Sequence, residues 1–169
     1  MVQELIDLRQ SIVEGRYQDA LNIIDELEGM SKQAILRNLE SFLIRLFIHL
    51  IKNQLEQRLT NSWAASISDS VVQIKKLNLK DNKKSYFIKQ NEWLSFFEEA
   101  ISLAIRPASI EILSGSLKPA QISAQLNRDE LIAISQRLID MTYKYPVVQL
   151  PDKIDLLLAE LPGGEEWIS

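Results

Sequence analysis

The sequence of 169 residues has no cysteine, one histidine, five glycines and five prolines. Without cysteine the chain can form no disulfide, no thiolate nucleophile and no cysteine metal site. A single histidine would leave a zinc site dependent on carboxylates, which are an uncommon donor set. The scarcity of glycine and proline disfavours turn-rich all-β, collagen-like and low-complexity chains. We therefore expect neither a metal nor another cofactor.

Basic charge and long apolar runs are also scarce. The net charge is -4, whereas a general nucleic-acid binder usually needs a basic surface to displace counterions. The longest apolar stretch, residues 43–51, contains Arg45 and His49 and is far shorter than the roughly 20 residues of a membrane helix. The N-terminal segment carries Glu4, where a signal peptide would carry bases. These features predict a cytoplasmic protein without a membrane partner, and they disfavour nucleic acid as a partner.

Hydrophobic residues make up 46% of the chain, and in nearly every segment they recur at the three- and four-residue steps of an amphipathic helix. The first two such segments end at Gly15 and Gly29, which predicts a helical hairpin. A repeat array is disfavoured because no second copy of the pattern follows. Ser31 is a suitable N-cap for a third helix. No glycine or proline interrupts residues 31–58, so this helix would be roughly 40 Å long at ~1.5 Å per residue.

Shorter elements are expected after this helix. Proline lacks the amide N–H and disfavours a helical residue before it, so Pro107 is expected to stop or kink a helix. The expected segments are a cap at residues 61–62 with a helix to about 74, a lysine-rich connection over 79–84, a helix over 85–106, helices starting at Pro119 and Asn127, an extended segment over 145–151, a final helix over 152–161 and an acidic tail over 162–169.

The expected fold is all-α: a helical bundle around one long central helix at about residues 31–58, with additional short C-terminal helices. The length favours a single helical domain over residues 1–169. Its core is expected at residues 2–106. The extension over residues 107–169 either packs on that core or forms a small subdomain.

The middle of the expected central helix is apolar almost all round. At 100° per residue, Ile44, Ile48 and Ile51 lie opposite the main apolar face. Such a helix is normally buried in a core or in a subunit interface. These three isoleucines therefore predict an interface with a protein partner or with a second copy, as in a homodimer. A non-enzymatic module for protein–protein interaction or self-association is the leading functional hypothesis.

A narrow polar stripe on the same helix contains Arg45, His49, Lys52 and Glu56. Residues four apart are neighbours on a helix surface, so one interpretation is a solvent-facing strip with an ordinary Lys52–Glu56 ion pair. The alternative is a polar pocket, with Glu26 as a nearby acid, in which a small-ligand binder or an enzyme would hold an anion. Acid–base catalysis is the weaker form of this alternative, because no recognisable nucleophile or orienting group lies nearby.

Six lysines between residues 75 and 89 surround a single acid, Asp81, with Tyr86 and Phe87 nearby. Basic and aromatic residues together can bind single-stranded nucleic acid. A lysine-rich loop is more often simply solvated, and the chain as a whole is acidic. A nucleic-acid-linked regulator is therefore the weakest of the three functional hypotheses.

Two short motifs carry a family resemblance. The segment from His49 to Lys52 reads His-Leu-Ile-Lys, and Ser-Trp follows at Trp63, with Ile67 four residues later. Together with Glu26, these motifs resemble the cyanobacteria-rich family called domain of unknown function twenty-nine, over about residues 5–105. The resemblance implies an α-helical fold and no known activity. We expect Trp63 and Ile67 to be structural, because a tryptophan at a helix start suits packing on the turn.

Overall fold

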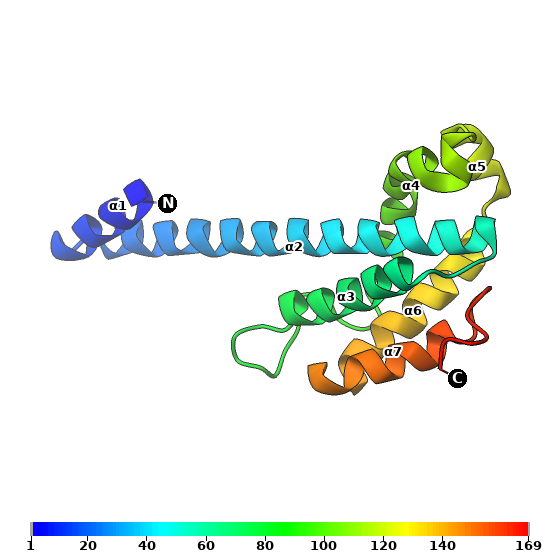
Figure 1. The fold of residues 1–169 in the computed structure, drawn as a ribbon. Helices are drawn as coiled ribbons and strands as arrows, with labels where there is room; N and C mark the ends of the chain where they lie inside the picture. Colours follow the sequence, from blue (N-terminus) through cyan, green and yellow to red (C-terminus); the bar gives the residue numbers. More distant parts are fainter. Residues whose placement is uncertain (1, 169) are drawn as a thin grey trace. The chain divides into compact units, whose positions relative to one another are not determined.

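A computed structural model describes residues 2–168 and confirms the all-α class (Figure 1). The described residues form seven α-helices and two short 3-10 helices, and their one β-bridge joins Leu79 and Tyr86. In chain order the helices are α1 (Val2–Val13), α2 (Tyr17–Glu56), α3 (Asn61–Asn78), α4 (Leu94–Glu111), η1 (Ile112–Gly115), α5 (Pro119–Gln125), α6 (Arg128–Lys144), η2 (Val147–Gln149) and α7 (Leu150–Leu158).

The long central helix is present, but it starts much earlier than predicted. α2 runs for 40 residues through Gly29 and Ser31 without a break, so the predicted helix end at Gly29 and the predicted N-cap at Ser31 are wrong. Glycine inside a helix costs only about 1 kcal/mol relative to alanine, which good helix formers on either side can offset. A glycine ends a helix when it turns left-handed. Gly15 does so at φ +74, and the predicted hairpin turn lies there.

The chain divides into two compact units, described residues 2–38 and residues 39–168, and α2 contributes to both. In the first unit, α1 turns at Gly15 and packs back along the start of α2 as an αα-hairpin. Among the described residues of this unit, Ser11 and Ala20 are the ones that are buried. The hairpin thus has almost no core of its own.

The second unit holds the hydrophobic core. The later part of α2 contributes fully buried residues, including Phe47, whose ring meets that of Phe97 on α4 edge-on at a centroid distance of 5.9 Å. Trp93 stacks on Phe97 at 5.9 Å. Helices α3, α6 and α7 pack against one another, and Leu138 and Ile154 are fully buried among them.

The helix expected over residues 85–106 is shifted. The segment before α4 is irregular, because the side chain of Asn78 accepts a hydrogen bond from Ile88 N at 2.7 Å and donates one to Ile88 O at 3.0 Å. These bonds hold Ile88 in a non-helical conformation. At the other end, α4 passes through Pro107 and ends at Glu111. The carbonyl that Pro107 leaves without an N–H donor belongs to Leu103, which is exposed, so water can satisfy it.

Two predicted C-terminal helices are confirmed, one that starts at Pro119 and one that starts at Asn127. The Asn127 side chain accepts a hydrogen bond from Glu130 N. The expected extended segment over residues 145–151 is confirmed at Tyr145 and Pro146, whose backbone is extended, and is wrong for the residues that follow. Residues 147–151 form η2 and the first turn of α7. Proline is well suited to a first turn, where Pro151 lies, because the N–H groups there have no helical partner. The described part of the predicted tail folds back, and Asn53 Nδ2 donates to Pro162 O at 2.8 Å. Residue 169 lies outside the described residues.

Candidate functional site

The polar stripe on α2 begins with Arg45, which ties this helix to α3. Its Nη1 lies 2.8 Å from Asp69 Oδ2, and its Nη2 lies 3.3 Å from Ser66 Oγ. More than a third of each charged side chain is exposed. An ion pair in that setting is screened by water and contributes about 1 kcal/mol at most. Arg45 is therefore bound within the chain.

His49 is half-buried one turn further along. Its Nδ1 lies 2.9 Å from Arg45 O, and because a carbonyl can only accept, Nδ1 carries the proton and Nε2 remains an acceptor. Burial lowers the pKa of His49, and the neighbouring charges of Lys52 and Arg45 lower it further. The carbonyl of Arg45 and the carboxylate of Glu111 act in the opposite direction. His49 is thus favoured as a neutral imidazole.

Lys52 is almost completely buried, and it is held by two other helices. Its Nζ lies 2.5 Å from Glu111 Oε2 on α4 and 4.6 Å from the ring centroid of Trp63 on α3. The hydrogen bond from Lys52 is the main reason why the pKa of Glu111 is lowered. A carboxylate and an indole face together neutralise an ammonium that burial would otherwise penalise. The motif residues Trp63 and Ile67 are themselves buried.

Among the described residues, neither of the two predicted acids forms an ion pair with Lys52. Glu56 accepts from Arg58 Nε at 3.2 Å, so the predicted Lys52–Glu56 ion pair is wrong: each residue has another partner. Glu26 is exposed and belongs to the first unit. The charged ends of Arg45 and Lys52 are bound to different groups, Asp69 and Glu111. This arrangement describes a helix-packing network rather than a shared anion pocket.

The three isoleucines predicted at an interface differ in exposure. Ile51 is completely buried by the chain's own core, so its surface needs no second chain. Ile44 and Ile48 are half-buried. Ile44 lines a small hollow beside α4 together with Phe96 and Leu103. Of the three isoleucines, Ile44 and Ile48 therefore retain apolar surface that a partner could cover.

A larger uncovered apolar surface lies on the α1–α2 hairpin. At 100° per residue, Leu5 and Ile12 are turned by about 60° and 40° from Leu8, a half-buried residue of α1. On α2, Tyr17 and Ile24 are turned by about 60° and 40° from the buried Ala20, in the same sense. In two antiparallel helices, side chains that are turned by equal angles from the line of contact lie on the same side of the helix pair. The resulting hairpin face consists of Leu5 (51% exposed), Ile12 (50%), Tyr17 (67%), Leu21 (54%) and Ile24 (36%).

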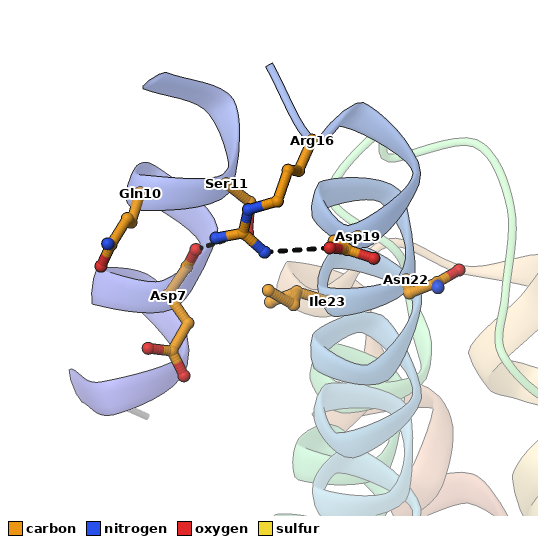
Figure 2. Close-up of a pocket in the computed structure, with 7 residues that line it drawn as sticks. All are labelled: Asp7, Gln10, Ser11, Arg16, Asp19, Asn22 and Ile23. Carbon is orange, nitrogen blue, oxygen red and sulfur yellow. Dashed lines mark hydrogen bonds and ion pairs between the residues drawn. The ribbon is translucent and has the colours of Figure 1, made fainter. Parts of the chain in front are cut away.

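The other side of the hairpin is polar (Figure 2). Arg16 there bonds to Asp19 and to Glu14, both at 2.9 Å. These bonds raise the pKa of Arg16, and the pKa of Glu14 is lowered by hydrogen bonds from Gln10 and then from Arg16. Ser11 Oγ, between the helices, donates to Asp7 O at 2.8 Å. The hairpin is therefore two-sided, and the hairpin face is its apolar side.

Neither a metal cluster nor a single membrane-spanning helix is present in the part of the chain that the structure describes. No group of three or more histidine, aspartate or glutamate side chains there could hold a metal ion. None of the described helices by itself combines the length and the apolar character of a membrane-spanning segment. A pair that includes α4 and α5 passes the same test of length and composition, but it is bent by 93°.

Comparison with known proteins gives one family. Residues 6–144 match the model of the family described as Domain of unknown function DUF29. The match confirms the resemblance expected from the sequence and continues well past residue 105, through α6. No curated protein and no solved structure matches the chain.

Proposed function

The chain belongs to the family described as Domain of unknown function DUF29, and we propose that it is a self-association module whose hairpin face binds the same face of a second copy. The observation that carries the proposal is the near absence of a core in the first unit. Ser11 and Ala20 are its buried residues, while large apolar side chains line one side. A helical unit of fewer than about 40 residues normally needs a metal, a disulfide or a partner to be stable.

The area of the hairpin face supports a partner of ordinary size. Its five side chains are one-third to two-thirds exposed. Such a patch presents on the order of several hundred Å². A standard interface buries about 800 Å² per partner, so the patch can supply most of one side.

A second copy fits the hairpin by shape. Two hairpins that pack face to face form a four-helix bundle in which each helix is antiparallel to its neighbours, and the two-fold axis runs along the bundle. In that arrangement α1 lies across from α2 of the second copy. The hairpin face then becomes the inside of the bundle, and the polar side with Arg16 remains in water.

The charges at the rim of the hairpin face are complementary in the same arrangement. Ser11 and Ala20 are both buried at the α1–α2 contact, so Arg9 lies level with about residue 22. In the proposed bundle, Arg9 therefore lies about 4.5 Å along the bundle axis from Asp25 of the second copy. No ion pair among the described residues uses Arg9 or Asp25. The proposed dimer gives each of them a partner.

Light scattering after size exclusion, over a range of concentrations, tests the proposal. We expect the measured mass to be twice the chain mass of 19.4 kDa and to fall to the mass of a single chain on dilution. Leu21→Glu should raise the protein concentration at which the dimer dissociates at least tenfold, because the variant buries a charge in the bundle. Leu156→Glu is the matched control, since Leu156 on α7 is also 54% exposed; it should leave the mass unchanged.

A charge exchange identifies the second copy as the partner. Arg9→Glu should weaken the dimer, and adding Asp25→Arg to the same chain should restore it. A wild-type chain that stays monomeric at all concentrations contradicts the proposal. So does a dimer that survives Leu21→Glu but is lost in Ile48→Asp, because that result would place the interface beside α4.

A further inference from the structure

A second feature, independent of self-association, is a basic pocket at the C-terminal end of α3. The pocket has a volume of about 400 Å³. Four lysines line it, Lys75, Lys76, Lys80 and Lys83, with Asp81 as the one acid among the lining residues. Four positive charges and one negative charge leave a net charge of +3 in a chain whose total is -4.

The lysine charges have no ion-pair partner among the described residues. No ion pair among the described residues includes any of the four lysines or Asp81. Lys75 is 8% exposed, and its Nζ donates to Thr142 O at 2.5 Å. Lys80 Nζ lies 5.4 Å from the ring centroid of Phe87. A carbonyl and a ring face orient these ammonium groups, but neither group carries the full negative charge that would neutralise them.

The helix end explains only half of this cluster. Lys75 and Lys76 lie in the last turn of α3, where the helix dipole favours cations. Lys80 and Lys83 lie beyond the helix, on a loop that returns toward it. The loop is held by Asn82 Oδ1, which accepts from Lys84 N at 2.9 Å and from Ser85 N at 3.1 Å. These bonds order the loop that carries the two additional charges.

Lys83 occupies its position at a cost in backbone energy. Its φ is +60, in the left-handed region that costs an L-residue roughly 1–2 kcal/mol and costs glycine nothing. A glycine would complete the turn more cheaply but would remove a cation from the pocket. Gln57, Leu113 and Ser114 are left-handed as well, so it is the coincidence of this conformation with converging charge that points toward a function at Lys83.

We propose that the pocket binds a phosphorylated small molecule through its phosphate or pyrophosphate group. Ammonium groups act as point-charge ligands for phosphate oxygens. Lys76, Lys80 and Lys83 supply ammonium groups that form no ion pair with a described residue, and Lys75 adds a positive charge held by a backbone carbonyl. Leu79 and Val147 complete the lining and provide apolar contact for the non-phosphate part of the ligand. Because the pocket lies wholly within residues 39–168, binding does not depend on the hairpin.

Isothermal titration of the full chain with inorganic pyrophosphate, at constant ionic strength, tests this proposal. We expect saturable binding to one site per chain. Lys80→Gln and Lys83→Gln should each weaken it about tenfold or more, because each removes a charge-assisted hydrogen bond. Lys118→Gln is the control, since this exposed lysine precedes α5 and does not line the pocket. It should leave the affinity unchanged.

Lys83→Gly separates binding from folding. Because glycine accepts the left-handed turn, this variant should unfold at an equal or higher temperature and still bind pyrophosphate at least tenfold more weakly. Three results would overturn the proposal: no binding of pyrophosphate by the wild-type chain, equal losses in Lys118→Gln and Lys83→Gln, or tighter binding of a single-stranded decathymidylate through the same lysines. The last result would identify a nucleic-acid surface instead. None of these results depends on whether the chain is a dimer.

Discussion

Lys52 is a nearly buried charge whose partners come from two other helices. Its side chain is 8% exposed, while that of its partner Glu111 is 55% exposed. The aliphatic part of the lysine packs inside the second unit, and its ammonium reaches the edge of α4 and the face of Trp63. The residue therefore joins α2, α3 and α4. This role accounts for a nearly buried lysine on α2.

Removing the carboxylate from this contact should be costly. We expect Glu111→Gln to lower the free energy of unfolding by about 1–2 kcal/mol, because Lys52 then lacks a charged acceptor. The double variant Lys52→Met/Glu111→Gln should regain part of that loss, since methionine fills similar space without a charge. Urea denaturation monitored by tryptophan fluorescence measures both changes.

Glu160→Gln is the control for this experiment. Glu160 pairs with Arg137 at 2.7 Å, and both side chains are more than half exposed. Its loss should change stability by less than about 0.5 kcal/mol. A cost for Glu160→Gln as large as that for Glu111→Gln, or a double variant no more stable than the single one, would contradict the assigned role of Lys52.

At the scale of elements, α2 is the unusual feature. It remains helical for 40 residues although Gly29 and Ser31 lie within it. At Gly29 a Cβ atom would meet nothing within 4 Å, and the same holds at Gly15. The two glycines differ in backbone conformation: Gly15 is left-handed at φ +74, whereas Gly29 has ordinary helical geometry. They form a natural pair for testing how backbone conformation alone affects stability.

Alanine at these two glycines should act in opposite directions. Gly29→Ala is expected to stabilise α2 by roughly 0.5–1 kcal/mol, because alanine loses less backbone entropy in a helix. Gly15→Ala is expected to destabilise the hairpin by about 1 kcal/mol, because alanine resists the left-handed turn. Thermal melting followed by far-ultraviolet circular dichroism measures both. Equal effects of the same sign would contradict the difference in conformation.

At the scale of the whole molecule, burial is divided unequally between the two units. The first unit buries Ser11 and Ala20 among its described residues, whereas the second contains the large buried side chains, including Trp93 and Phe47. All three tryptophans lie in the second unit. Tryptophan fluorescence therefore reports on the second unit alone, while circular dichroism reports on the helices of both.

This division predicts two melting transitions in dilute solution. The circular dichroism signal should begin to fall at a lower temperature than the fluorescence signal changes, because the hairpin has little buried apolar area to hold it. Raising the protein concentration should bring the two transitions together, since a bound second copy stabilises the folded hairpin. Leu21→Glu should keep them apart at every concentration. Coincident transitions at the lowest concentration would contradict the unequal division.

Local signals account for what could be predicted correctly. Apolar spacing indicated helices, the left-handed preference of Gly15 placed the hairpin turn, and Pro119 and Asn127 placed two helix starts. Each of these signals acts between residues a few positions apart, so a sequence carries it in full. The motif around His49 and Trp63 likewise identified the family over much of the chain.

The sequence by itself determined the helical class, most of the turns and the family. Only the tertiary structure decided which residues meet. Lys52 pairs with Glu111, 59 residues away, rather than with its helical neighbour Glu56. Asn78 holds Ile88 out of a helix that apolar spacing favoured. The sequence also shows equivalent apolar stripes on α1, α2 and α4, and cannot tell which stripe other helices will cover. That depends on the packing of distant segments, because burial is a property of the whole fold.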